Sequence, residues 1–174
     1  MSSQDKSLTG VARTFGEHEL IVSKTDLHGK ITYANDVFLR VAQYTEEELL
    51  GSPHSIVRHP HMPRCVYKLL WDTIQGGNEI FAYVVNRSKL GDHYWVLAHV
   101  TPSFDIGGNI ISYHSSRRKP DPGACQRIEE IYRSLLDIES RAADKATGMA
   151  RSTEALVKFL NERGVSYEEF VFTV

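Results

Sequence analysis

Three histidines and one cysteine fall within a twelve-residue stretch, at His54, His59, His61 and Cys65. Imidazole nitrogen and thiolate sulfur are good zinc ligands. However, four, one and three residues separate successive members, and this spacing fits no standard structural zinc arrangement. The first three also lie in a segment that two prolines make irregular. We therefore predict no metal site.

The sequence also shows no pattern that would indicate an enzyme. It has no glycine-rich phosphate-binding loop, no nucleophile elbow and no paired-carboxylate pattern. The acidic run Glu46-Glu47-Glu48 belongs to the start of a helix, where the helix dipole stabilises negative charge. We predict no catalytic residue and no enzymatic activity.

Composition excludes further classes of function. Lys and Arg total 20 against 22 Asp and Glu, so the chain has no large positive field for nucleic acid or an anionic membrane. The longest apolar runs, such as residues 81–85, are far shorter than the roughly 20 residues that span a bilayer. There is no export signal, and the two cysteines are far apart. We predict a cytoplasmic protein without membrane insertion and without a nucleic-acid partner.

The alternation of apolar and polar residues predicts a mixed fold. Residues 20–25 and 30–35 flank an Asp-Leu-His-Gly turn, which predicts a hairpin. Three further strand-like runs follow a helical region, at 80–87, 93–104 and 110–117. Two strands, several short helices and three strands cannot form a βαβ repeat. We predict an α+β fold in which short helices gather on one face of a five-stranded antiparallel sheet and leave a pocket.

Local signals place the helices between the strands. Asn35 or the next residue can cap a short helix that runs through Val41. Thr45 and Glu48 form a capping box for a second short helix. A longer helix is predicted to begin at Pro63 and to end before Gly76 and Gly77.

These signals divide the chain into three parts. Residues 1–18 are polar with scattered apolar positions and predict an arm or short helix that caps the domain. Residues 19–119 hold the sheet and its helices. Residues 120–174 form a helical extension, continuous through 139–163, and an apolar tail from residue 167 that needs a surface on this chain or on a partner.

Several motifs in the predicted sheet-and-helix domain carry a resemblance to a known family. They are Thr25-Asp26-Leu27, Tyr33-Ala34-Asn35-Asp36, Val57-Arg58-His59-Pro60, Met62-Pro63, Asn86-Arg87 and Gly91-Asp92-His93-Tyr94-Trp95-Val96. The Arg-His-Pro-x-Met-Pro run and the Gly-Asp-His-Tyr-Trp run are the most specific. With them, residues 20–118 resemble the PAS sensor domain of bacterial aerotaxis receptors.

The resemblance implies a cofactor and a role. In that family the PAS domain binds FAD non-covalently, and the redox state of the flavin reports respiratory status to a chemotaxis system. His61 stands where the family commonly has Asp, and Ile80 stands near a position where some members have Trp, so a cofactor contact is missing or replaced there. The receptors continue into a HAMP linker and a coiled coil, whereas this chain stops at Val174. We expect a stand-alone PAS protein that signals to a separate receptor or kinase, and a homodimer.

Seven residues could contact FAD, which needs an apolar slot, donors for its ring edge and positive groups for its pyrophosphate. They are Asn35, Arg58, His59, His61, Trp71, Asn86 and Trp95. Alternative roles remain open, since Asn35 can be a helix cap and Trp71 can be core packing. Because Tyr94 and Trp95 alternate along a strand, one of them must point toward the helices, and we assign Trp95 to that side.

Two other interpretations compete with FAD, haem and a cofactor-free module, whereas a flavin photosensor does not fit the sequence. Some PAS domains hold haem b through one axial histidine, for which His59 or His61 could serve. A flavin photosensor needs an Asn-Cys-Arg-Phe type motif, whereas Cys65 lies in Pro-Arg-Cys-Val. A cofactor-free module could dimerise through the arm and the C-terminal helices. In the FAD interpretation, flavin reduction shifts Asn35, Asn86 and their strands, and the arm and the helix from Asp121 carry the output.

Overall fold

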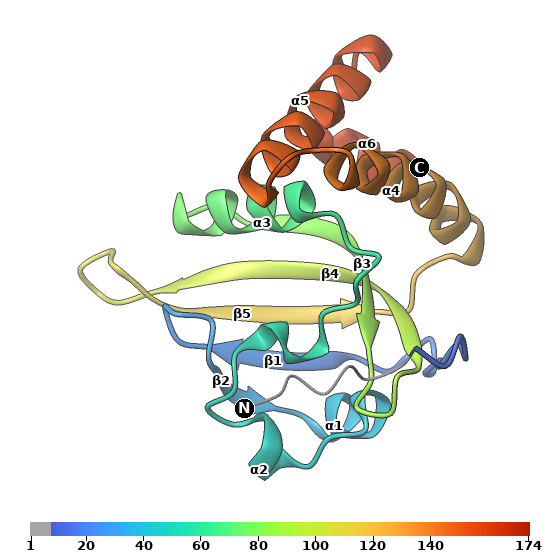
Figure 1. The fold of residues 1–174 in the computed structure, drawn as a ribbon. Coiled ribbons are helices and arrows are strands. Elements are labelled where there is room, and N and C mark those ends of the chain that lie inside the picture. Colours follow the sequence, from blue (N-terminus) through green and yellow to red (C-terminus); the bar gives the residue numbers. More distant parts are fainter. Residues whose placement is uncertain (1–7) are drawn as a thin grey trace.

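A computed structural model describes residues 8–174. Five antiparallel strands form one sheet in the order β2-β1-β5-β4-β3 (Figure 1). Their bounds are Ile21–Thr25 (β1), Ile31–Ala34 (β2), Ile80–Arg87 (β3), His93–Phe104 (β4) and Ile110–Arg118 (β5). The five strand segments and the α+β class predicted from the sequence are confirmed.

The β1–β2 hairpin forms because its turn satisfies its own backbone. Asp26 Oδ1 accepts hydrogen bonds from the backbone N–H groups of His28 and Lys30, each at 2.9 Å. Gly29 takes a φ of +76°, which costs a residue without a Cβ little. The turn therefore fixes the register, in which Ser23 pairs with Ala34.

Short helices cover one face of this sheet, which we call the inner face. They are α1 (Asp36–Ala42), α2 (Glu46–Leu49), the 3-10 helix η1 (His54–Val57) and α3 (Arg64–Gln75). Asn35 caps α1, and the predicted capping box of Thr45 and Glu48 begins α2. Their apolar residues pack on inner-face positions of the strands, including Val96 and Ala98, which are almost fully buried.

The segment between α2 and α3 crosses the inner face from one edge of the sheet to the other. At the β2 edge, the Ile31 N–H donates to the Ser52 carbonyl at 2.9 Å. At the β3 edge, Arg58 forms an antiparallel bridge with Asn86. We call residues 51–58 the crossing segment. It forms the floor of the space between the sheet and α3.

Three helices follow the sheet: α4 (Pro122–Ser140), α5 (Lys145–Arg163) and α6 (Tyr167–Thr173). The predicted continuous helix through 139–163 is wrong, because residues 141–144 turn the chain and Asp144 caps a new helix. The α5 helix packs on α3, while Tyr132 of α4 donates to the Tyr83 carbonyl of β3 at 2.6 Å. The C-terminal helices thus enclose the β3 side of the sheet (Figure 1).

The apolar tail finds its surface within the chain. It forms α6, in which Phe170 and Val171 are buried and the Phe172 ring lies 4.8 Å from the ring of Phe81 on β3. The described part of the N-terminal arm, residues 8–18, contains no helix. It runs along the start of β4, where Ala12 bridges His93, and residues 1–7 lie outside the described part.

No helix among residues 8–174 combines the length and the apolar character that a membrane-spanning helix needs.

Candidate cofactor-binding site

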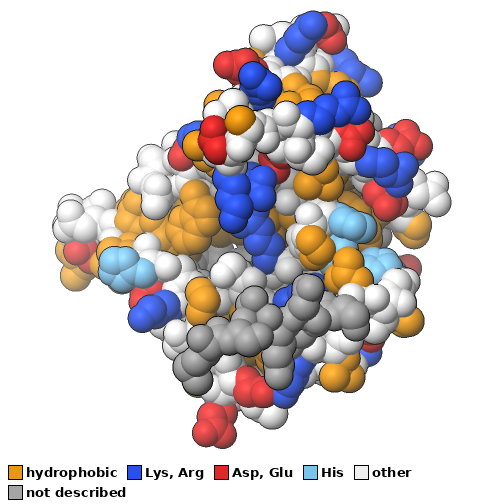
Figure 2. Space-filling view, in the orientation of Figure 1, with side chains coloured by type: hydrophobic (Ala, Val, Ile, Leu, Met, Phe, Trp, Pro, Cys, Tyr) orange, Lys and Arg blue, Asp and Glu red, His pale blue; other side chains and the backbone are white. Residues whose placement is uncertain are grey.

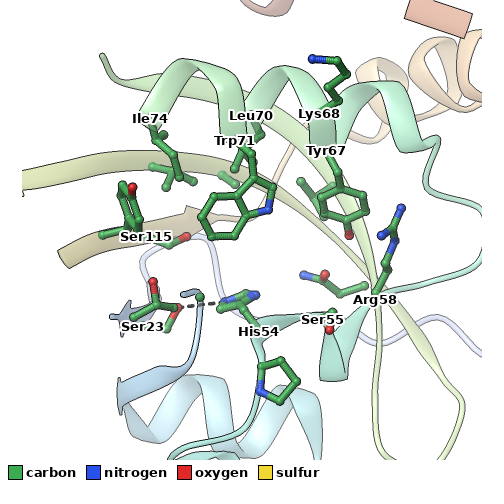
Figure 3. Close-up of a pocket in the computed structure, with 18 of the residues that line it drawn as sticks. Ser23, His54, Ser55, Arg58, Tyr67, Lys68, Leu70, Trp71, Ile74 and Ser115 are labelled. Atoms are coloured by element: carbon green, nitrogen blue, oxygen red, sulfur yellow. Dashed lines mark hydrogen bonds between the residues drawn. The ribbon is translucent and has the colours of Figure 1, made fainter. Parts of the chain in front are cut away.

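A cavity of about 540 Å³ lies between the inner face of the sheet, the crossing segment and α3. Trp71 and Tyr67 from α3 and His54 from η1 point into it from opposite sides (Figure 3). Its volume falls in the range of about 300–1,000 Å³ that is usual for small-molecule and cofactor sites. Most of the wall surface is apolar, although about half of the lining residues carry a polar or charged side chain.

Arg117 of β5 is the most unusual group in the cavity wall. Its side chain is 2% exposed, and Nη2 donates to Ser23 Oγ at 2.5 Å. Within residues 8–174, Nε and Nη1 have no hydrogen-bond partner, and no carboxylate forms an ion pair with the guanidinium. Burial lowers the pKa of Arg117 to about 10, so it is still a cation at neutral pH. The wall of the cavity therefore holds an unpaired positive charge.

His54 lies beside this charge. Its Nε2 is 3.1 Å from Ser23 Oγ, the same hydroxyl that accepts from Arg117 (Figure 3). Burial, with the nearby guanidinium of Arg117, lowers the pKa of His54 to about 3. The imidazole is therefore neutral at physiological pH and offers one donor and one acceptor nitrogen.

An aromatic wall closes another side of the cavity. Trp71 meets the Tyr113 ring of β5 edge to face, with 5.6 Å between ring centroids. Gly29 lies directly against Trp71, and a Cβ at that position would come within 3.0 Å of the indole. The hairpin turn thus fixes the indole in place. A planar apolar surface of this kind suits a flat aromatic ligand.

Arg58 and Asn86 lie together where the crossing segment meets β3. The Arg58 guanidinium stacks 4.1 Å from the Tyr67 ring centroid and has no ion-pair partner in the described chain. Asn86 is 3% exposed, and its side-chain amide bonds to no other described residue. Arg58 and Asn86 therefore line the cavity, as Trp71 also does. The side-chain hydrogen-bonding groups of Arg58 and Asn86 are left available for a ligand.

The other four predicted site residues do not line this cavity. Asn35 uses its amide at the start of α1, where Oδ1 accepts from Val22 and Phe38 and Nδ2 donates to the Leu20 carbonyl. The alternative role as a helix cap is the one observed. Its spacing after the strand was the signal for this, since Asn is a preferred N-cap.

Trp95 faces away from the cavity, contrary to our assignment. It lies on the outer face of β4 and stacks on Tyr132 of α4 at 6.1 Å, while Tyr94 is fully buried on the inner side. Tyr94 and Trp95 do point to opposite faces of the sheet, as predicted, but the C-terminal helices provide a second apolar surface on the outer face. The larger side chain of the pair packs there.

His59 and His61 lie on the other side of the Arg58 backbone, in contact with each other at 4.7 Å between ring centroids. His59 Nδ1 accepts from the His61 N–H. Burial and the neighbouring cationic groups lower the pKa of His59 to about 4. Neither ring lines the main cavity, so the axial haem position that we assigned to them is not found there.

A second, more open cavity of about 810 Å³ adjoins the first at Arg58 and Arg64. Arg87, Lys145 and His59 also line it, and the Arg87 Nε has no partner among the described residues. Lys and Arg side chains gather at the centre of this face of the molecule (Figure 2). The positive charge is thus concentrated between the two cavities, although the chain as a whole is slightly acidic.

Sequence reasoning missed several groups of the site. The strand period could have found Arg117, since Tyr113, Ser115 and Arg117 share one face of β5. No local signal places Arg64 of α3 or Met149 of α5 at the cavity, because the docking of α5 on α3 brings Met149 there. In residues 8–174, no three His, Cys, Asp or Glu side chains form a group that could hold a metal ion.

Comparison with known proteins places these features in a family. The family model described as PAS fold matches residues 21–114, more than half of the chain. The aerotaxis receptor of Escherichia coli is 41% identical over 115 residues, which are 66% of this chain and 22% of the receptor. Phototropin-1A of Oryza sativa is 30% identical over 80 residues, 46% of this chain and 9% of that protein. The chain thus spans less than a quarter of the length of these two relatives.

Solved structures support the same fold. A light-oxygen-voltage domain studied with a flavin analogue superposes with a TM-score of 0.59 at 18% identity, over 67% of this chain and 88% of that one. The dark state of the Aureochrome1 LOV photoreceptor gives 0.55 at 24% identity, over 68% and 86%. The chain belongs to the PAS family, and its PAS domain is of the aerotaxis-receptor type.

Proposed function

We propose that the chain is a cytoplasmic redox sensor that holds FAD non-covalently between the sheet and α3. It signals to a chemotaxis receptor or kinase, with two copies of the chain acting together. The similarity to the aerotaxis receptor supports the sensory role. The unpaired guanidinium of Arg117 in the cavity wall is the observation that carries the cofactor proposal. A buried cation without a counter-ion is costly, and a ligand with acceptor atoms or negative charge relieves that cost.

The residues present fit the parts of FAD. The isoalloxazine requires an apolar aromatic surface, which Trp71 supplies, with its indole held edge to face against Tyr113. Asn86, His54 and Arg117 supply donors at the polar end of the cavity. Arg58 and Arg64 stand where the two cavities meet and can pair with phosphate oxygens. The second cavity offers room for an adenosine, which favours the dinucleotide over the mononucleotide.

Bound FAD would supply reversible electron transfer, which no side chain of this cavity offers. Arg117 would stabilise negative charge that develops beside it, because its guanidinium is fixed and poorly solvated. His54 is neutral and can donate or accept a hydrogen bond according to its tautomer. Asn86 can rotate its amide to match a change from acceptor to donor. The chain thus responds to the redox state through groups on η1, β3 and β5.

The output would leave through the two elements attached to these strands. Asn86 of β3 pairs with Tyr94 of β4, and the next pair along the two strands is Arg87 with His93. The N-terminal arm contacts this second pair, because Ala12 bridges His93. On the outer face, Tyr132 of α4 is bonded to the Tyr83 carbonyl of the same β3 strand. A shift of β3 therefore reaches α4 directly and the arm through the paired residue His93 of β4.

An absorbance spectrum of gently purified protein tests the cofactor. Two flavin bands, with FAD and not FMN released on denaturation, would support the proposal. A Soret band would replace it with haem. A colourless protein that remains colourless after incubation with FAD would leave the cofactor-free interaction module.

A further inference from the structure

The first turn of α3 lacks a cap of its own. The residue before it is Pro63, which makes no side-chain cap bond. Glu139 of α4 takes this role from outside, because its Oε1 accepts from the Cys65 N–H at 3.2 Å. The same oxygen accepts from Ser152 Oγ of α5 at 2.9 Å. Glu139 is 6% exposed, so one buried carboxylate joins α3, α4 and α5.

Close packing holds this carboxylate in place. Gly148 of α5 lies against the α4 backbone, and a Cβ there would be 2.8 Å from the Glu139 carbonyl oxygen. The next residue, Met149, lines the main cavity. The α5 helix therefore contacts Glu139 and the cavity through two consecutive residues, Gly148 and Met149.

Arg64 connects this junction with the cavities. Its Nη1 is 3.5 Å from Glu139 Oε2, and among residues 8–174 it is the one cation that pairs with this carboxylate. The Arg64 side chain is 39% exposed and lines both cavities, next to Arg58. An anion bound where the two cavities meet would also lie close to the Arg64 guanidinium. Glu139 and such an anion would share the charge of one guanidinium, so each would weaken the attraction of Arg64 to the other.

We propose that Glu139 affects cofactor binding through Arg64: it positions the Arg64 guanidinium and competes for it with the anionic part of the ligand. When the ligand engages Arg64, Glu139 loses its cation and the docking of α4 and α5 on α3 loosens. Conversely, docking of these helices weakens ligand binding, since coupling between two sites is reciprocal. This inference rests on the proposed FAD site and names the route by which occupancy reaches the C-terminal helices.

The substitution Glu139→Gln separates this role from a structural one. The glutamine oxygen can still accept from the Cys65 N–H and Ser152 Oγ, but it no longer holds Arg64 by charge. We expect FAD to bind roughly fivefold more tightly to this variant, the lower end of common coupling strengths. A purely structural loss at the junction would instead weaken binding. Glu130→Gln, on an exposed position of the same helix, is the matched control and should leave affinity unchanged.

The experiment is a titration of FAD into flavin-free full-length chain, with hydrogen exchange of α4 and α5 measured with and without FAD. In the wild type, FAD should increase exchange around residues 139–152, and Arg64→Gln should weaken binding and abolish that increase. Unchanged or weaker FAD affinity in Glu139→Gln, or an unaltered FAD response in Arg64→Gln, would overturn the competition while the FAD site stands. Failure of the wild type itself to bind FAD would overturn the proposed function.

Discussion

Arg117 lies 4.4 Å over the ring of Phe38, and its guanidinium makes one hydrogen bond within residues 8–174, to Ser23 Oγ. The aromatic face offers the guanidinium a partial substitute for solvent, since cation–π contacts contribute about 0.5–2 kcal/mol. It does not supply an acceptor for Nε and Nη1. The folded protein therefore keeps a binding group ready at a cost to its own stability.

The substitution Arg117→Met should separate stability from binding. Removing an unpaired buried charge is expected to leave the free energy of unfolding of the flavin-free chain unchanged or to raise it by about 1 kcal/mol. Loss of a charge-assisted hydrogen bond should weaken FAD binding at least tenfold, or about 1.4 kcal/mol. Denaturation and FAD titration of the same preparation measure both quantities.

Arg118→Gln provides the control, because Arg118 is the exposed neighbour on the same strand. It should alter neither quantity. A large destabilisation of Arg117→Met without FAD would show that the guanidinium has a structural partner, and it would remove the main support for the cofactor proposal.

Gly29→Ala should change FAD binding through Trp71. The new Cβ would meet the indole Cη2 at 3.0 Å, so Trp71 must shift toward the cavity. The positive φ adds a backbone cost of roughly 1 kcal/mol. Gly108→Ala is a matched control, with a φ of +81° and no atom within 4 Å of the added carbon. Both variants should lose similar stability, and only Gly29→Ala should lose FAD affinity, by several-fold; equal affinities would argue against the Trp71 wall.

The histidines of the site predict acid sensitivity of the flavin-free chain. The pKa of His54 is about 3 in the folded state against about 6.5 unfolded, so the unfolded chain takes up the proton first as the pH falls. The stabilising contribution is present above pH 6.5 and is lost progressively below it, at up to about 1.4 kcal/mol per pH unit. His59, with a pKa of about 4, acts in the same direction.

Unfolding free energies measured between pH 7 and pH 5 check this, above the range where carboxylates titrate. His54→Gln should reduce the number of protons taken up on unfolding at pH 5 by close to one, and so flatten the dependence of the unfolding free energy on pH. A slope that His54→Gln leaves unaltered would mean that the imidazole takes up its proton at the same pH in the folded and the unfolded chain.

The two tryptophans should respond oppositely to substitution. Trp95→Leu removes packing between β4 and Tyr132, and we expect a loss of about 1–3 kcal/mol in stability with FAD affinity preserved. Trp71→Leu should reduce FAD affinity more than stability, because Trp71 lines the cavity. If Trp95→Leu instead released FAD from an otherwise stable protein, the cavity assigned here would be the wrong site.

Local signals in the sequence predicted much of this fold. The strands follow from their period and their turns, and the capping box at Thr45 and Glu48 is present as expected. Those signals act over a few residues. The turn at 141–144 and the helical tail do carry local caps, Asp144 and the Ser166–Glu169 capping box, which our prediction did not use. Their packing against α3 and β3 depends instead on long-range contacts.

The candidate site was harder to predict for the same reason. Arg58, Trp71 and Asn86 line the cavity. Arg58 and Asn86 were assigned through their motifs, and Trp71 through its residue type. Asn35 and Trp95 have the right residue types, but the helix start and the α4 surface compete for them. The strand period places Arg117 on one face of β5 with Tyr113 and Ser115, but only the burial of that face makes its charge significant.

The crossing segment also affects how copies of this chain can meet. It pairs with Ile31 on one edge strand of the sheet and with Asn86 on the other. Exposed strand edges are the usual templates for edge-to-edge aggregation and for amyloid-like growth, and backbone groups already bonded cannot serve in this way. Where the crossing segment is bound, neither edge can recruit a foreign strand. Association of two copies is therefore expected to use side-chain surfaces, and the sheet itself resists growth into fibres.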